Sequence, residues 1–115
     1  MNHLTALQTE AADQVFAALG DATRRAIVEL VAQGPQSVSA LAAALNVTLT
    51  AISQHLRVLQ TCGILQTRKV GRVRMCELDG HGLDVLAHWV AVNRRMWEQR
   101  FDALDAILQD DTEGK

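Results

Sequence analysis

The sequence predicts one mainly α-helical domain of about five helices with a small β-hairpin, covering residues 1–115. Apolar residues recur at helical spacing along most of the chain, which is the main signal for amphipathic helices. A single proline, Pro35, leaves long helices uninterrupted. Two short runs of alternating residues flank Gly71, a pattern that favours a hairpin.

Two helices are expected before Pro35. The first covers residues 9–19 and is apolar along two lines, while residues 1–8 before it are expected to fray. Asp21 is expected to cap a second helix over residues 22–32, because its carboxylate can accept from the free N–H groups of the first turn.

A helix-turn-helix is predicted over residues 39–62. Ser37 or Ser39 caps a short, alanine-rich helix over residues 40–45, and a tight turn leads to Thr48, which caps the next helix. Two short helices joined in this way are typical of DNA-binding proteins.

The helix that Thr48 opens has two different faces, and it is expected to stop at Gly63 in the left-handed conformation. Its apolar face carries Ile52, Leu56 and Leu59. Its polar face carries Thr50, Ser53, Gln54 and Arg57. It contains no acid, which suits a helix in the major groove, although an ordinary solvated face has a similar composition.

A two-stranded hairpin is predicted over residues 64–78, with Gly71 in its turn. The cations on or near its tip are Arg68, Lys69, Arg72 and Arg74. A cationic hairpin directly after a helix-turn-helix favours a wing that contacts phosphates or the minor groove. The alternative is an exposed hairpin that its charges keep soluble.

A long helix is expected over residues 83–108, after a linker at 79–82, and the tail 110–115 is expected to be disordered. This helix is apolar on two sides, as is the helix over 9–19, so we expect both to pair in a homodimer; the alternative is deep burial within one chain. The expected interface residues are Val15, Phe16, Leu86, Trp89, Val90, Met96, Trp97, Phe101 and Leu104.

Charge is unevenly distributed although the net charge is only −2. Residues 30–76 hold five cations and no acid, whereas residues 77–115 hold nine acids and four cations. A basic centre between acidic ends indicates a nucleic-acid footprint, although an acidic protein or a membrane surface would also attract it. Four aromatic residues are too few for single-strand stacking platforms. The sequence shows neither a signal peptide nor a membrane span, so we expect a cytoplasmic protein with no membrane partner.

The order of these elements and several segments resemble a known family. The segments are residues 16–28, 53–59, 63–65 and 69–74. Ser53-Gln-His-Leu-Arg-Val-Leu59 followed by Gly63 is similar to the ArsR/SmtB family of bacterial winged-helix repressors, and the similarity extends over residues 11–108. It implies that DNA is faced by Thr48, Thr50, Ala51, Ser53, Gln54 and His55.

Two residues of this helix have two alternative roles each. Leu49 departs from the family, which often has a polar residue there; it could contact a thymine methyl group or pack against the preceding turn. His55 could bond to a phosphate or base, or bond within the fold.

The resemblance also raises the question of a sensor site, because the family includes metal-responsive members. The short third helix has no metal ligand, and the last helix offers only the pair Asp84 and His88, whereas a closed zinc site needs about four ligands. We therefore expect no metal and no cofactor. Cys62 and Cys76 could form a redox or arsenite site, although free cysteines more often pack as small apolar residues. The tryptophan-rich last helix is similar to an autorepressor-like subgroup without obvious metal ligands.

The sequence thus predicts a homodimeric winged helix-turn-helix repressor that binds a pseudo-palindromic operator in double-stranded DNA. A winged-helix module that binds an acidic protein, and a thiol- or arsenite-responsive repressor, are the alternatives. An enzyme is not expected, because no nucleophile–base pair, phosphate-binding glycine loop or convergent carboxylates can be found.

Overall fold

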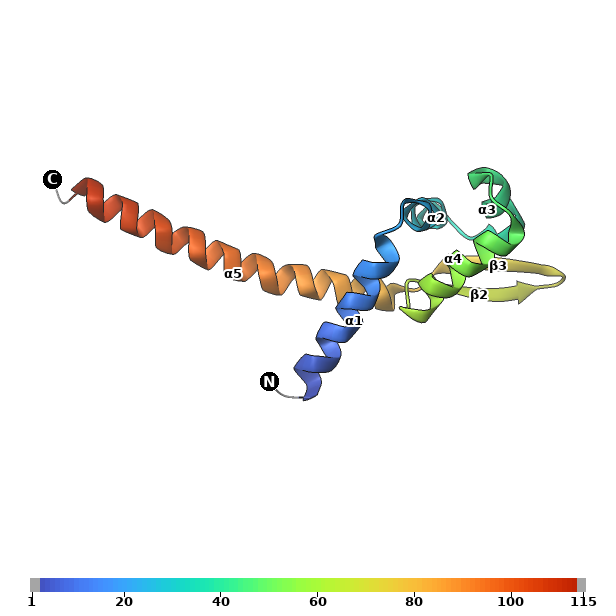
Figure 1. Cartoon of the computed structure of the whole chain (residues 1–115), viewed down its shortest axis with the longest axis horizontal. Helices are drawn as coiled ribbons and strands as arrows, with labels where there is room; N and C mark the ends of the chain where they lie inside the picture. Colours follow the sequence, from blue (N-terminus) through green and yellow to red (C-terminus); the bar gives the residue numbers. More distant parts are fainter. Residues whose placement is uncertain (1–2, 114–115) are drawn as a thin grey trace.

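The computed structural model describes the backbone of residues 3–113 and the side chains of residues 7–110. Five helices and a small three-stranded sheet are present in it (Figure 1). In chain order they are α1 (His3–Leu19), α2 (Ala22–Ala32), β1 (Gln36–Ser37), α3 (Val38–Leu45), α4 (Leu49–Thr61), β2 (Leu65–Val70), β3 (Val73–Leu78) and α5 (Gly80–Glu113). The predicted fold class is confirmed, with one additional short strand.

Helix starts in the centre of the chain follow from side-chain caps. The side chains of Asp21 and Thr48 accept hydrogen bonds from the backbone N–H groups three residues later, as expected. Ser37 caps α3 through Ala40 N at 3.0 Å, so this helix begins two residues before the predicted start.

The ends of α3 and α4 depend on left-handed backbone. Asn46 ends α3 with φ 54°, and Gly63 follows α4 with φ 76°, the conformation that was expected of it. A Cβ on Gly82 would lie 2.6 Å from the carbonyl oxygen of Cys62, so the start of α5 packs closely on the end of α4. Residues 80–82, expected in a linker, are therefore the first turn of α5.

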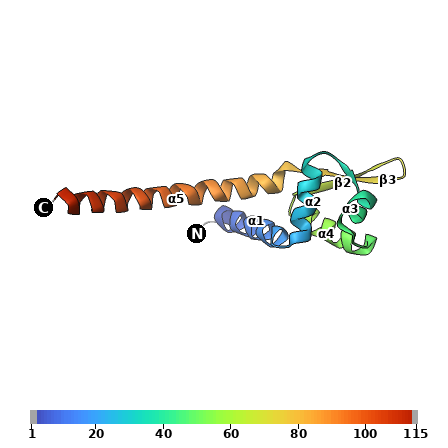
Figure 2. The same cartoon turned by 90° about the horizontal axis from the view of Figure 1, so that it is seen from above.

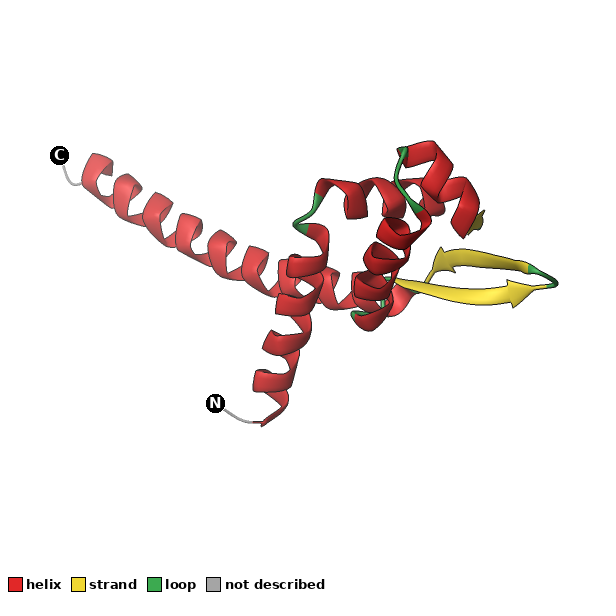
Figure 3. Ribbon diagram, turned by 45° about the vertical axis from the view of Figure 1, so that its right-hand side comes forward, coloured by secondary structure: helices red, strands yellow, loops and turns green. Residues whose placement is uncertain are grey.

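The sheet has the antiparallel order β1-β3-β2. β2 and β3 form the predicted hairpin, in register from Leu65 opposite Leu78 to Val70 opposite Val73. We call this hairpin the wing; it projects away from the helices in Figure 3. β1 pairs with β3 and was not predicted, because two residues carry no detectable period.

The core lies between α1, α2, α3, α4 and the inner end of the wing. Its largest buried side chains are Ile27, Leu41, Ile52, Leu59, Ile64, Leu65, Val15 and Cys76. The apolar stripe predicted for α4 is buried throughout. Val15 is 1% exposed within the single chain, so the expectation that it lies in a dimer interface is wrong: its side chain is already packed in the core.

Both terminal helices are longer than predicted. α1 begins at His3, so residues 3–8 are helical where fraying was expected, and α5 extends to Glu113 through part of the expected disordered tail. Residues 1–2 and 114–115 lie outside the described residues. The molecule is 75 Å long in its longest dimension, because α5 extends far beyond the other elements (Figure 2). α1 lies beside the first half of α5 (Figure 2).

Candidate nucleic-acid interface

The exposed face of α4 contains most of the residues expected to contact DNA. Thr48, Thr50, Ser53, Gln54 and Arg57 are all exposed. They alternate with buried residues of the same helix, so packing against the core aims them outward. Ala51 and His55 are only partly exposed and lie where α4 meets the core.

Leu49 lies on the open surface at the start of α4. Its side chain is 61% exposed, so it is not packed away against the preceding turn. The position next to Thr48 and Thr50 puts an apolar group among the polar side chains of this face.

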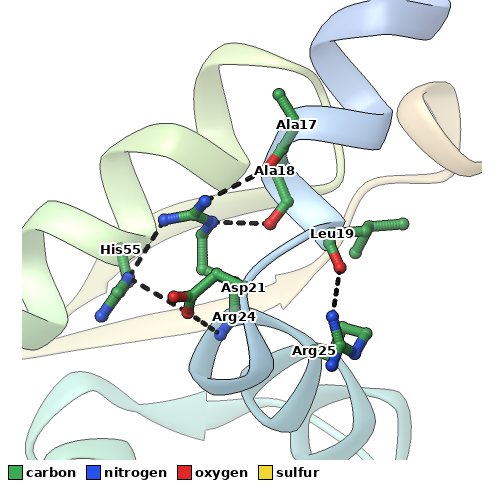
Figure 4. Close-up of polar contacts among 7 residues, drawn as sticks. All are labelled: Ala17, Ala18, Leu19, Asp21, Arg24, Arg25 and His55. Carbon is green, nitrogen blue, oxygen red and sulfur yellow. Dashed lines mark hydrogen bonds and ion pairs between the residues drawn. The ribbon is translucent and has the colours of Figure 1, made fainter.

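His55 takes part in a cluster of polar contacts with the beginning of α2 (Figure 4). Its Nδ1 lies 3.4 Å from Nη1 of Arg24 and 3.9 Å from Oδ2 of Asp21. Arg24 also donates from Nε to the carbonyl oxygen of Ala18 at 2.6 Å and from Nη2 to that of Ala17 at 3.2 Å. The histidine is therefore bonded within the fold, through an arginine that connects α1, α2 and α4.

Asp21 supports this cluster through its charge as well as its cap. The backbone N–H of Arg24, with a smaller contribution from the charge of its guanidinium, holds the pKa of the Asp21 carboxyl below its ordinary value. The residue is therefore an anion at neutral pH, between an arginine and a histidine.

The wing presents the four expected cations, and Arg68, Lys69, Arg72 and Arg74 are all exposed. Arg68 lies 3.4 Å from Glu77 in an ion pair that water screens, and its side chain remains 62% exposed. Among the described side chains, Lys69 and Arg72 form no ion pair, so their charges are available to an external anion.

Thr67 connects the wing to α4. Its hydroxyl accepts from Nε2 of Gln60 at 2.8 Å and from Nη1 of Arg74 at 3.1 Å. The base of the wing is thereby fixed to the end of α4. These roles of Gln60, Thr67 and Arg24 do not follow from the sequence, because residue spacing alone does not show which side chains meet across elements.

The two cysteines are free thiols in the structure. Cys76 is fully buried in β3, and Cys62 is partly buried at the end of α4, where its Sγ is 3.5 Å from the carbonyl oxygen of Leu59. Burial raises the pKa of both thiols, which disfavours the reactive thiolate.

The terminal helices α1 and α5 expose large apolar side chains. Phe16 of α1 and Trp89 of α5 pack edge to face, with ring centroids 4.9 Å apart. Beyond Trp89, large apolar side chains that are about half exposed run along α5: Val90, Met96, Trp97, Phe101, Leu104, Ile107 and Leu108. Leu86 packs partly against the core. Apart from Val15, the expected interface residues are thus partly or largely exposed in the single chain.

A cavity of about 650 Å³ lies between α1 and the first half of α5. Its lining includes His81, Asp84 and His88. Over the described residues, no group of three or more His, Cys, Asp or Glu side chains is placed to hold a metal ion. None of the described helices is long and apolar enough to cross a membrane.

The central part of the chain is similar to known bacterial regulatory proteins. Residues 21–67 match the bacterial regulatory proteins of the arsR family. The HTH-type transcriptional regulator Rv2034 of Mycobacterium tuberculosis is 47% identical over 74 residues, which are 64% of this chain and 69% of that protein. The matched stretch 21–67 begins at the cap of α2 and ends in β2, so it contains all of α4 and none of α5.

Solved structures share the fold over most of the chain. An ArsR-like transcriptional regulator from Rhodococcus sp. RHA1 has a TM-score of 0.76 and 35% identity, covering 86% of this chain and 93% of that one. The homodimeric winged helix-turn-helix DNA-binding domain Mb0332 from Mycobacterium bovis has a TM-score of 0.67, covering 90% and 93% of the two chains; at 24% identity it supports the fold alone.

Proposed function

This chain belongs to the arsR family of bacterial regulatory proteins, and from that premise we propose that it is a homodimeric, sequence-specific repressor. The family places it among transcriptional regulators with a winged helix-turn-helix DNA-binding domain, which is not an enzyme class. Repression, dimer formation, the contacting residues and a cytoplasmic location are parts of the proposal.

The observation that carries the proposal is the exposed, acid-free face of α4 beside a cationic wing. In the proposed complex α4 lies in the major groove, where hydroxyl, amide and guanidinium groups distinguish bases by their edges. Thr50, Ser53, Gln54 and Arg57 supply such groups, and Leu49 supplies a methyl-rich side chain that suits the C5-methyl group of thymine.

The wing gives affinity in this proposal more than specificity. Lys69, Arg72 and Arg74 reach the phosphates next to the groove that α4 occupies, and Gln60 and Thr67 hold the wing in register with α4. Neutralised phosphates release counterions, so each contact makes the affinity more sensitive to salt.

Dimer formation is supported by the apolar side chains that α5 leaves exposed. Tryptophan and phenylalanine are typical anchors of protein interfaces, and Trp97 and Phe101 are 55% and 64% exposed in the single chain. A two-fold dimer would read two half-sites about 10 base pairs apart, or a multiple of that, in a pseudo-palindromic operator.

Fluorescence anisotropy tests the proposal. The full chain is titrated into a labelled duplex from the region upstream of its own gene and into a random duplex of the same length, at two salt concentrations. We expect tight binding to the upstream duplex that weakens steeply with salt, and much weaker binding to the random duplex. Equal affinity for both would contradict sequence-specific recognition, and no salt-sensitive affinity for either would contradict DNA binding.

A further inference from the structure

The guanidinium of Arg24 is the contact through which three helices meet. It donates to two carbonyl groups at the end of α1, that of Ala18 and that of Ala17, the second of which also accepts from the backbone N–H of Gly20 at 3.3 Å. Its remaining nitrogen, Nη1, lies 3.4 Å from Nδ1 of His55 in α4 (Figure 4). The side chain is thus held at one end by α1 and presents N–H groups to α4 at the other.

The chemistry of the two groups fixes the direction of the bond. A guanidinium has five N–H donors and no acceptor, so the contact is a hydrogen bond only when Nδ1 of His55 is the acceptor. A neutral imidazole that accepts at Nδ1 carries its proton at Nε2. The bond to Arg24 therefore selects one of the two neutral tautomers of His55 and holds the ring in one orientation.

We propose that Arg24 is a positioning residue for DNA binding: it holds Nδ1 of His55 as an acceptor, so that α4 presents the Nε2–H of this ring as a donor to DNA. The DNA part of this inference rests on the proposed function. His55 follows Ser53 and Gln54 on α4, and its side chain is 24% exposed, so the ring is held by the core without being closed off from a ligand.

Asp21 completes the arrangement. Its Oδ2 accepts from the backbone N–H of Arg24 at 3.0 Å and lies 3.9 Å from Nδ1 of His55. The carboxylate thereby fixes the first turn of α2, which carries Arg24, and leaves the shorter contact at Nδ1 to the guanidinium.

Arg25 is the matched control. It is also on α2 and donates from Nη1 to the carbonyl oxygen of Leu19 at 2.7 Å, at the same end of α1. Among the described side chains, Arg25 bonds to α1 and has no bond to α4. Removing Arg25 therefore removes a bond to the end of α1 and one cation of α2, and leaves His55 unchanged.

The first test measures the tautomer in the free protein, by two-dimensional NMR of the ¹⁵N-labelled imidazoles well above the ordinary histidine pKa of about 6.5. We expect wild type and Arg25→Ala to hold His55 as the Nε2–H tautomer, and Arg24→Ala to show a mixture of both. Arg24→Lys serves if Arg24→Ala does not fold, because an ammonium does not reproduce the fixed fork that bonds α1 and His55 together. An unchanged tautomer in a folded Arg24 variant would overturn the inference.

The second test is a double-mutant cycle on the duplex that the wild type prefers. Arg24→Ala is expected to raise Kd about tenfold, the size typical of a hydrogen bond to a charged group, and Arg25→Ala much less. In a His55→Ala background Arg24→Ala should have little further effect. Full additivity would overturn the positioning role. The NMR test can also give the expected change of tautomer in Arg24→Ala while the wild-type protein shows no affinity for duplex DNA. That result would refute the proposed function, and with it the DNA part of this inference.

Discussion

The central part of the chain buries its large apolar side chains, whereas the distal part of α5 (residues 94–110) exposes them. From α1 to β3, the large apolar side chains on the inner faces of the helices converge on one core, and Ile52, Leu59 and Ile64 are fully buried. In the distal part of α5, Trp97, Phe101 and Leu104 remain exposed on a helix that extends away from the body (Figure 1).

This difference shows that a single chain covers the large apolar side chains of its central core but leaves those of the distal part of α5 exposed. The residues proposed to contact DNA are aimed by a core that is closed within the chain. A contiguous exposed apolar stripe marks an interaction surface, so α5 is the part of the chain where the proposed dimer contact is expected.

The largest effect is expected from opening the core. Leu59→Ala should lower the free energy of unfolding by about 2–5 kcal/mol, because the side chain is fully buried and its removal leaves a cavity. Leu49→Ala, at a 61% exposed position of the same helix, should change it by less than about 0.5 kcal/mol. Urea titration followed by circular dichroism measures both, and similar losses would remove the distinction between the two faces of α4.

The next effect separates α5 from the core. Trp97→Ala should weaken self-association by about 2 kcal/mol, as for an interface anchor, while the fold of the single chain is retained. Gln99→Ala, an exposed polar position two residues away, is the control. Sedimentation equilibrium gives the dissociation constants. A Trp97 variant that associates as the wild type does would place the interface elsewhere.

A third prediction divides the DNA interface itself. Gln54→Ala should reduce the preference for the upstream duplex over random duplex by about 1–2 kcal/mol, because an amide reads base edges. Arg72→Ala should weaken binding to both duplexes about equally and make the salt dependence shallower. Anisotropy titrations of the two variants on both duplexes decide this, and equal loss of preference in both would contradict the division.

A fourth prediction concerns the thiols. Burial raises the pKa of both Cys62 and Cys76, so iodoacetamide should alkylate them more slowly than a fully solvent-exposed cysteine thiol. The fully buried Cys76 should be the slower of the two. Mass spectrometry of timed samples gives the rates. Rapid modification accompanied by loss of DNA binding would instead favour a thiol-responsive repressor.

The smallest effect is expected from pH. The pKa of Asp21 is lowered in the folded state, so its stabilisation is fully present above the unfolded value of about 3.9 and is lost as pH falls through the folded value. Asp21→Asn keeps a good cap without the charge. Wild type should therefore lose its advantage over this variant when unfolding is measured at progressively lower pH, and a constant difference would show that the charge does not contribute.

Local features were predictable from the sequence because they depend on neighbours in the chain. The caps at Asp21 and Thr48, the left-handed Gly63 and the buried stripe of α4 are all decided within one or two turns. The hairpin around Gly71 is equally local. These elements are sufficient to locate the proposed DNA-binding face.

Features that depend on distant partners were not predictable. β1 is two residues long and exists because it pairs with β3, which lies about forty residues later. Arg24 and His55 are 31 positions apart, and only the packing of α2 against α4 brings them together. Val15 looked available for a partner because the pattern of α1 is apolar on two lines, and the pattern does not show which line faces the core.

Footprinting on the preferred duplex tests most directly whether α4 and the wing of each chain contact DNA while α5 pairs two chains. With the full chain, hydroxyl-radical protection should appear at two symmetric half-sites whose centres lie about 10 base pairs apart or a multiple of that. Trp97→Ala should require a higher protein concentration to protect the same two half-sites. Protection of a single half-site by the wild-type protein, with no symmetric partner, would contradict the account.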